Sequence, residues 1–267
     1  MSDIEVNGVR LQYTDTGDGN ESIVFSHGLL MSGDMYARQI AHFSNRYRCI
    51  AYDHRGQAGS GVSQNGYDMD TLADDAAGLI HALDIAPCHF VGLSMGGFVG
   101  MRLAINQPEL LRSLILLDTN ADAEPTESAL KYKLLNFIAR WFGLRIVAGQ
   151  VMPILFGKTF MTDNARTVER ADWRRHIASH NRKGITRSVK GVIERKGIYD
   201  QLDKITRPTL VAVGNEDVAT PLATGQRIAD AIGGADFRII KNAGHSATVE
   251  QPDAVNDIIE QFLRELK

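Results

Sequence analysis

The sequence predicts an α/β fold, with a mostly parallel sheet of about eight strands, helices on both faces and a helical insertion. Short apolar runs alternate with helical patterns from residue 22 to residue 117, which is typical of parallel strands joined by crossover helices. The alternation stops between residues 121 and 204, where no strand-like run occurs, and resumes at Thr209. A chain of 267 residues suffices for one such domain with an insertion.

The expected elements begin with a hairpin. Residues 4–6 and 10–15 predict its two strands, because Asn7-Gly8 between them is a strong two-residue turn signal. Further strands are expected at 22–25, 48–52, 88–91, 113–117, 209–214 and 237–240, and helices at 71–83 and 98–105. The chain is therefore expected to form a core domain, residues 1–120 and 205–267, and a helical cap, residues 121–204.

The most informative motif is Gly-Leu-Ser-Met-Gly-Gly at residues 92–97, between an expected strand and an expected helix. Strand, Gly-x-Ser-x-Gly, helix is the pattern of a nucleophile elbow, a turn so sharp that side chains at Gly92 and Gly96 would collide with backbone. The turn exposes the Ser94 hydroxyl and places the next amide at a helix N-terminus, where negative charge is favoured. The alternative is a glycine-rich turn that contains a serine by chance, so the motif needs partner residues.

A serine nucleophile needs a base, and the base needs an orienting carboxylate. Asp217 follows the expected strand 209–214, and His245 follows 237–240, in the chain order Ser, acid, His. Parallel strands bring the loops at their carboxyl ends to one edge of the sheet. We therefore predict that Ser94, His245 and Asp217 meet there as nucleophile, base and acid.

Other residues compete for these roles. Asp118, just after the expected strand 113–117, is the alternative acid, whereas Glu216 would point away from the site. Asp217 is favoured because it occupies the usual place in the chain order. None of the other histidines follows the last strand: His27, His42, His54, His81, His89, His176 and His180.

Two backbone amides are expected to bind the oxyanion of the reaction. One is the N–H of Met95, directly after the nucleophile. The other comes from the loop after strand 22–25, where Leu29 is the best candidate. His27 in the same loop is expected to hold the loop rather than to act in catalysis.

On these motifs the chain resembles the α/β-hydrolases over nearly its whole length. The motifs in family order are Ser26-His27-Gly28, Asp53-His54-Arg55-Gly56, the elbow, Gly214-Asn215-Glu216-Asp217 and Gly244-His245. It is similar to small carboxylesterases, to cofactor-free haloperoxidase-type esterases and, at residues 207–210 and 245–252, to 3-oxoadipate enol-lactonases. Gln57 and Tyr36 depart from the residues common in these relatives, near the expected pocket. A serine at position 94 separates the chain from epoxide hydrolases and haloalkane dehalogenases, which have aspartate there.

Composition narrows the class further. A net charge of −3 with 23% charged residues indicates neither nucleic-acid nor membrane binding, and residues 1–5 do not begin a signal peptide, so a cytoplasmic location is expected. Cys49 and Cys88 are expected as buried thiols. The histidines are dispersed, and no dinucleotide-binding fingerprint follows the first parallel strand, so we expect neither a metal nor a cofactor.

The expected cap has two unusual features. Its 16 Lys and Arg against 9 Asp and Glu give a net charge of +7, which indicates either a solvated surface, the favoured interpretation, or a basic rim that steers anionic substrates. Its apolar stretch 129–157 is interrupted by charges and does not span a membrane; an interfacial helix is the alternative. We expect five of its side chains to pack on the core and roof the pocket: Trp141, Phe142, Met152, Leu155 and Phe156.

The function expected from the sequence is cleavage of a small-molecule carboxylic ester through a Ser94 acyl-enzyme. A lactonase that opens a cyclic ester by the same steps is the alternative. A non-catalytic small-molecule binding module is the remote one. The sequence does not indicate an oligomeric state.

Overall fold

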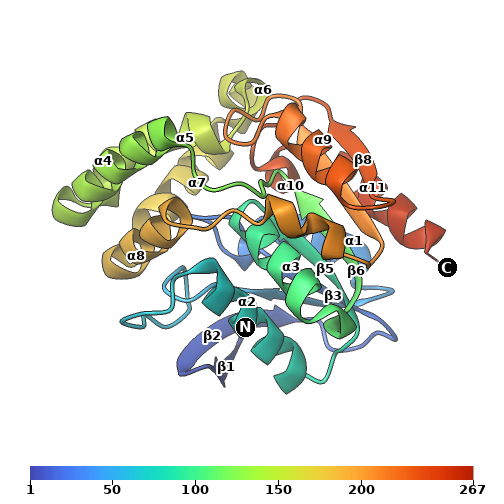
Figure 1. Ribbon diagram of the computed structural model, residues 1–267. Coiled ribbons are helices and arrows are strands. Elements are labelled where there is room, and N and C mark those ends of the chain that lie inside the picture. Colours follow the sequence, from blue (N-terminus) through green and yellow to red (C-terminus); the bar gives the residue numbers. More distant parts are fainter. Residues whose placement is uncertain (267) are drawn as a thin grey trace.

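A mostly parallel sheet forms the centre of the computed structural model, which describes residues 1–266 (Figure 1). Within these residues the sheet has eight strands in the order β1-β2-β4-β3-β5-β6-β7-β8. Their bounds are β1 Ser2–Val6, β2 Val9–Asp15, β3 Ser22–Ser26, β4 Arg48–Tyr52, β5 Cys88–Leu93, β6 Leu111–Leu117, β7 Thr209–Gly214 and β8 Asp236–Ile240. β1, β2 and β4 pair antiparallel, and every other pairing is parallel. Asn7 and Gly8 both have positive φ, as the tight hairpin turn requires.

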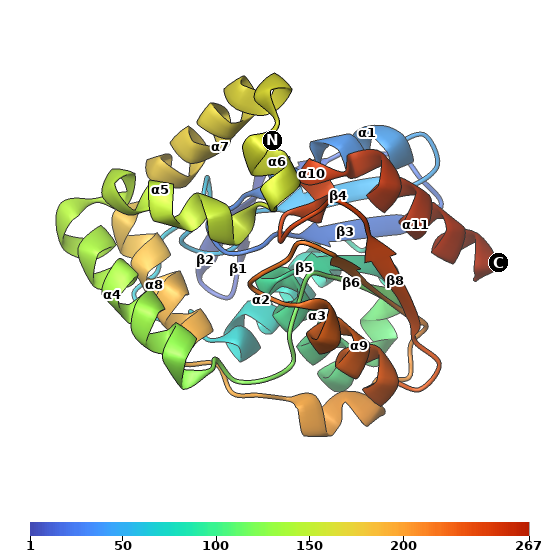
Figure 2. The same ribbon diagram turned by 90° about the horizontal axis from the view of Figure 1, so that it is seen from above.

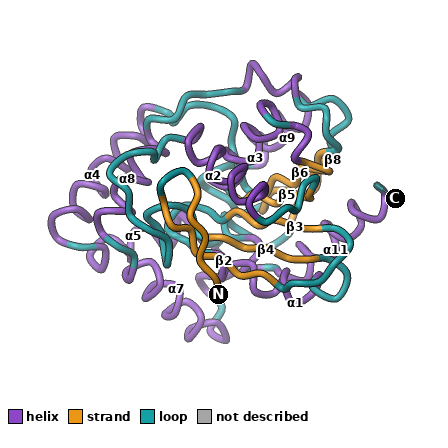
Figure 3. Tube along the Cα trace, turned by 90° about the horizontal axis from the view of Figure 1, so that it is seen from below, coloured by secondary structure: helices purple, strands orange, loops and turns teal. Residues whose placement is uncertain are grey.

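Helices cover both faces of the sheet, which Figure 3 shows with strands in orange and helices in purple. One face packs on α2 (Met69–Ala82), α3 (Met95–Asn106) and α9 (Leu222–Ala231); the other packs on α1 (Ala37–Phe43) and α11 (Pro252–Glu265). Alternate strand residues face opposite sides, so Phe90 joins the first apolar cluster and Val91 the second. The central strands are mostly apolar because both of their faces are buried. The predicted fold class is confirmed.

The segment between β6 and β7 is helical, and residues 121–204 contain no strand. Its helices are α4 (Thr126–Phe142), α5 (Leu144–Leu155), α6 (Lys158–Thr162), α7 (Thr167–Ser179) and α8 (Arg182–Ile193). Figure 2 shows α4, α5, α7 and α8 grouped beside the sheet, with α4 outermost. The apolar stretch 129–157 is divided at Gly143, whose φ of 95° separates α4 from α5. In the described chain no helix is both long and apolar enough to cross a membrane.

Two of the five side chains expected to pack on the core do not. Met152, Leu155 and Phe156 are buried as predicted, but Trp141 and Phe142 are 63% and 66% exposed, so the prediction for these two is wrong. The reason is that α4 is apolar on more than one side. It meets α5 and α8 through the side that carries Ala139, and hydrophobic spacing alone does not tell which side is covered.

Candidate active site

Ser94 lies at the turn between β5 and α3 in a strained backbone conformation, with φ 53° and ψ −112°. Such a conformation in a non-glycine residue costs about 1–3 kcal/mol and persists only where the surroundings enforce it. A Cβ atom at Gly92 would overlap the carbonyl oxygen of Gly96, and one at Gly96 would overlap that of Ser26. The Ser94 amide also donates to Leu117 O at 2.9 Å. The turn therefore has the geometry predicted from the Gly-x-Ser-x-Gly spacing.

The structure brings Ser94, His245 and Asp217 into one hydrogen-bonded chain. Ser94 Oγ lies 2.7 Å from His245 Nε2, and Asp217 Oδ2 lies 2.8 Å from His245 Nδ1. Asp217 is itself held by the Ala219 and Thr220 amides, which donate to Oδ1, and by the Thr220 hydroxyl, which donates to Oδ2 at 2.5 Å. Each of the three residues follows a parallel strand, so all three lie at the carboxyl edge of the sheet.

The electrostatics of the chain favour a protonated Nδ1 on His245. Burial opposes a charged imidazole, but the charge and hydrogen bond of the Asp217 carboxylate outweigh it and raise the pKa of His245. Burial likewise opposes a charged Asp217, yet His245 and the Thr220 donors lower the pKa of that carboxyl below its usual value. An ionised Asp217 therefore accepts from Nδ1–H and leaves Nε2 free to accept the Ser94 proton.

The alternative acids lie elsewhere. Asp118 Oδ1 accepts from the Gly214 amide at 2.7 Å and does not reach His245, and burial together with the neighbouring Asp217 charge raises the pKa of Asp118 well above its usual value. Glu216 points away and accepts from the amide and hydroxyl of Thr159. The structure thus places Asp217, and neither alternative, on the histidine.

The two residues predicted to supply the oxyanion donors, Leu29 and Met95, line the same cavity as Ser94. Within the described residues the amides of Leu29 and Met95 have no hydrogen-bond acceptor, and Met95 is the first residue of α3. His27 holds the first loop, as expected: its Nδ1–H donates to Gly28 O at 2.7 Å, and its Nε2 accepts from the His54 amide at 3.0 Å. Both free amides are therefore available to an anionic oxygen.

A cavity of about 370 Å³ opens beside Ser94 and His245. Its largest wall is apolar and comes from α4, α5 and α8, with the side chains of Leu135, Ala139, Leu144, Val147, Val151, Leu155, Ile185 and Val189. A concave, mostly apolar site with a few polar groups is typical of small-molecule binding. In the described part of the chain no group of His, Cys, Asp and Glu side chains is arranged to hold a metal ion.

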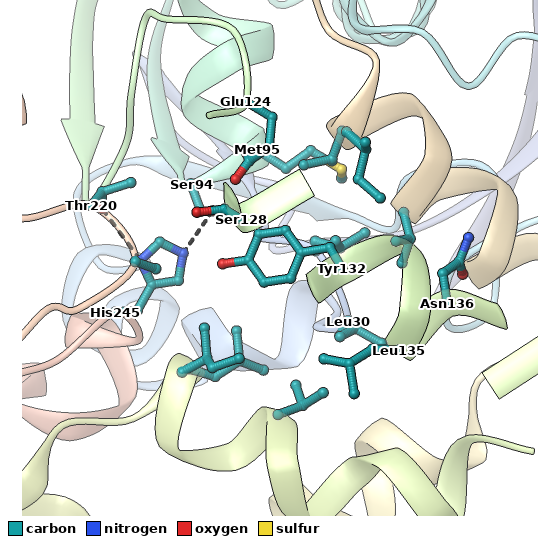
Figure 4. A pocket seen from close by; sticks show the side chains of 18 of the residues that line it. Leu30, Ser94, Met95, Glu124, Ser128, Tyr132, Leu135, Asn136, Thr220 and His245 are labelled. Carbon is teal, nitrogen blue, oxygen red and sulfur yellow. Dashed lines mark hydrogen bonds between the residues drawn. The ribbon is translucent and has the colours of Figure 1, made fainter. Parts of the chain in front are cut away.

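A smaller part of the cavity is polar. Figure 4 shows the Tyr132 hydroxyl pointing toward His245, with Glu124 near Met95 and Ser94. Glu124 forms a buried ion pair with Arg195 at 2.6 Å, and the Arg195 guanidinium also lies over the Phe98 ring. The pair adds no net charge to the cavity. Of the six basic residues at 174, 175, 182, 183, 195 and 196, all within the described chain, Arg195 alone lines this cavity.

Comparison with known proteins assigns this architecture to a family. The model of the alpha/beta hydrolase fold matches residues 21–252. The chain belongs to the α/β-hydrolase fold family. It is 29% identical over 257 residues to 3-oxoadipate enol-lactonase 2 of Acinetobacter baylyi. The aligned region covers 96% of this chain and 94% of the relative. The family and this relative agree with the class of enzyme expected from the sequence, an ester or lactone hydrolase.

Two solved structures are similar to this α/β-hydrolase over its whole length. A thermophilic esterase from Thermogutta terrifontis has a TM-score of 0.92 at 28% identity and covers 100% of this chain and 99% of its own. The enol-lactonase of Burkholderia xenovorans LB400 has a TM-score of 0.92 at 29% identity, with 98% and 100% covered. The fold is therefore shared with esterases and lactonases alike.

Sequence reasoning missed Glu250, a buried carboxylate that holds the histidine loop of this hydrolase. Its Oε2 accepts from the amides of Gly244 and Gly157, and its Oε1 accepts from the Ser246 amide. The amides of both residues next to His245, Gly244 and Ser246, therefore donate to one side chain, which also anchors the start of α6. The sequence does show a carboxylate five residues after His245. It does not show that this side chain also binds Gly157, which lies 93 residues from Glu250 in the chain.

The roles of Gln57 and His180 were also missed: together they hold Leu30, the residue after the first predicted oxyanion donor. Leu30 has φ 67°, its amide donates to Gln57 Oε1 at 2.9 Å, and His180 Nε2–H donates to its carbonyl oxygen at 2.9 Å. The Ala58 amide donates to the other ring nitrogen of His180. A loop in an unfavourable conformation is thus fixed by one side chain from the core and one from the helical segment.

Proposed function

We propose that this α/β-hydrolase is a serine esterase that cleaves carboxylic esters with neutral, apolar acyl groups. The observation that carries the proposal is the 2.7 Å contact between Ser94 Oγ and His245 Nε2, with Asp217 on the other ring nitrogen, at the mouth of a largely apolar cavity. Residues 121–204 serve as a cap that supplies most of this apolar wall, and residues 1–120 and 205–267 serve as the core that carries the reacting groups.

The reaction proceeds through an acyl-enzyme. His245 Nε2 takes the Ser94 proton as Oγ attacks the acyl carbon, and the amides of Leu29 and Met95 bind the oxygen that becomes negative. Asp217 keeps Nδ1 protonated and stabilises the imidazolium. His245 then gives its proton to the departing alkoxide oxygen. In the second half His245 removes a proton from water, the hydroxide attacks the acyl carbon, and Ser94 leaves with that proton.

The cavity favours a neutral acyl group. Arg195 is the sole Lys or Arg side chain that lines it among the described residues, and Glu124 neutralises it. A carboxylate-bearing substrate would have to compete with Glu124 for that guanidinium or lie unpaired against apolar side chains, which costs free energy. The basic side chains at 174, 175, 182, 183 and 196, which are exposed and do not line the cavity, are thus better explained as a solvated surface than as a rim that steers anionic substrates.

A lactonase is the second candidate, favoured by the likeness at 29% identity to two enol-lactonases. Ring opening uses the same groups, with the leaving oxygen retained on the acyl chain. A panel of p-nitrophenyl esters of increasing acyl length, a γ-lactone, and one ester with a free carboxylate distinguishes the candidates.

In that panel we expect kcat/KM for neutral esters to rise about fourfold for each added methylene, because each buried methylene stabilises binding by about 0.8 kcal/mol, until the cavity is full. The lactone and the carboxylate-bearing ester should be poorer substrates. A fluorophosphonate should also label Ser94 in the wild type and not in His245→Ala. Faster turnover of the lactone than of every ester would favour the lactonase. The absence of both turnover and labelling would favour a binding module.

The pH dependence of kcat/KM should show a single ionisation with a midpoint above about 6.5, the ordinary value for histidine. Only neutral His245 accepts the Ser94 proton, and the Asp217 carboxylate raises the pKa of His245 despite burial, so activity is lost as the pH falls through that raised value. Burial lowers the pKa of His27 to about 4 and of His180 to about 3, so neither titrates in this range. A rate that falls as the pH rises from 6 to 8 would contradict the role of His245.

A further inference from the structure

The outward side of α4 carries a stripe of large apolar side chains. Leu130, Leu134, Phe137 and Trp141 are each between 58% and 65% exposed, and their spacing of four, three and four residues aligns them along one side of the helix. Phe137 and Trp141 are ring neighbours, with centroids 6.4 Å apart. We call these four residues the outer face of α4.

Packing within the chain does not account for this face. The opposite side of α4 lines the cavity with Tyr132, Leu135, Asn136 and Ala139 and meets α5 and α8. Figures 1 and 2 both show α4 at the periphery of the molecule, farther from the sheet than α5. A contiguous patch of exposed large apolar side chains generally marks a surface that is covered by another molecule.

Positive charge borders the outer face. Lys131, Lys133, Arg140 and Arg145 are all exposed, against a single acidic residue, Glu127, on α4 and α5. At 100° per residue Lys133 and Arg140 border one edge of the stripe, and Lys131 borders the other together with Glu127. Two copies that met through this face would bring like charges together, whereas a negatively charged surface would pair with them. Apolar and aromatic side chains between cationic ones are the pattern of helices that lie on anionic bilayers.

We propose that the outer face of α4 docks on an anionic lipid bilayer. Trp141 and Phe137 would insert among the acyl chains near the headgroups, while the flanking lysines and arginines pair with lipid phosphates. Because the other side of the same helix is a wall of the cavity, docking places the cavity next to the phase in which apolar esters dissolve. The proposal does not depend on the assignment of the catalytic residues.

Binding of the full chain to vesicles tests the proposal. Vesicles of phosphatidylglycerol and phosphatidylcholine in equal parts should co-sediment at least about tenfold more protein than phosphatidylcholine alone, and the difference should shrink as NaCl rises from about 50 mM to about 500 mM. Trp173→Phe leaves Trp141 as the single tryptophan, since the chain has two. Its emission should shift to the blue on the anionic vesicles, as expected for an indole that leaves water.

Matched variants separate this face from general charge effects. Phe137→Glu and Trp141→Glu should each reduce binding to anionic vesicles by about tenfold, whereas Val168→Glu makes the same charge change at an exposed valine on α7 and should leave it unaltered. All three variants should retain wild-type turnover of a water-soluble ester, because Phe137, Trp141 and Val168 are not among the described residues that line the cavity. The proposal is wrong if anionic vesicles bind no better than neutral ones, or if Val168→Glu is as damaging. A dimer that Phe137→Glu dissociates, without vesicle binding, would show instead that a second copy covers the face.

Discussion

Ser94→Ala should reduce ester turnover by on the order of a millionfold, because the change removes the oxygen atom that forms the acyl-enzyme in the proposed reaction. Alanine fits the turn, so the variant should fold, with an unfolding midpoint close to that of the wild type. The measurement is kcat for the best p-nitrophenyl ester of the panel, with thermal unfolding measured in parallel.

The double variant Ser94→Ala/His245→Ala should lose little more than either single variant, because residues that act as one unit have non-additive effects. Ser246→Ala is the matched control. That hydroxyl is buried beside His245 and has no hydrogen-bond partner among the described residues, so its removal should change kcat by less than about tenfold. Additive losses in the double variant would mean that Ser94 and His245 do not act together.

Asp217→Asn should reduce kcat by about a thousandfold to ten-thousandfold. An asparagine amide can donate to Nδ1, which leaves the proton on Nε2 and removes the acceptor that Ser94 needs. The loss of the carboxylate charge should also lower the midpoint of the pH profile, since that charge is what raises the pKa of His245 against burial. Both the rate and the midpoint are read from kcat/KM measured across pH.

Asp118→Asn provides the comparison. Burial and the nearby Asp217 charge keep the pKa of Asp118 well above its usual value, and its Oδ1 accepts from the Gly214 amide. An asparagine oxygen can take the same hydrogen bond, and kcat should stay within about tenfold of the wild type. If Asp118→Asn is the more damaging of the two, the acid of the reaction is Asp118.

Local sequence signals sufficed for the elements that carry the proposed site. The elbow was predictable because glycine at 92 and 96 is required by contacts within the turn and with the adjacent strand, and this requirement is visible in the spacing alone. The strands were predictable because a parallel sheet covered on both faces makes each central strand a short, continuous apolar run. Chain order then placed Asp217 and His245 at the same edge as Ser94.

The sequence favoured Asp217 over Asp118 by chain order alone, because both residues follow parallel strands that end at that edge. Asp118 has φ 45° and turns toward the Gly214 amide on β7, whereas Asp217 reaches Nδ1 of His245, and only the packed sheet shows this difference. The role of Glu250 was not predicted for a similar reason, since one of the three backbone amides that donate to it is distant in sequence.

What the sequence by itself determined is the set of local conformations: the strands, the hairpin, the elbow and the helical character of residues 121–204. These follow from side-chain periodicity and from backbone limits that act over a few residues. What only the tertiary structure decided is which groups meet. The side of α4 that faces the cavity, the exposure of Trp141 and the clamp on Leu30 by Gln57 and His180 all depend on contacts between distant segments. Such contacts are set by how whole elements pack, and periodicity along one helix carries no information about which neighbour will cover it.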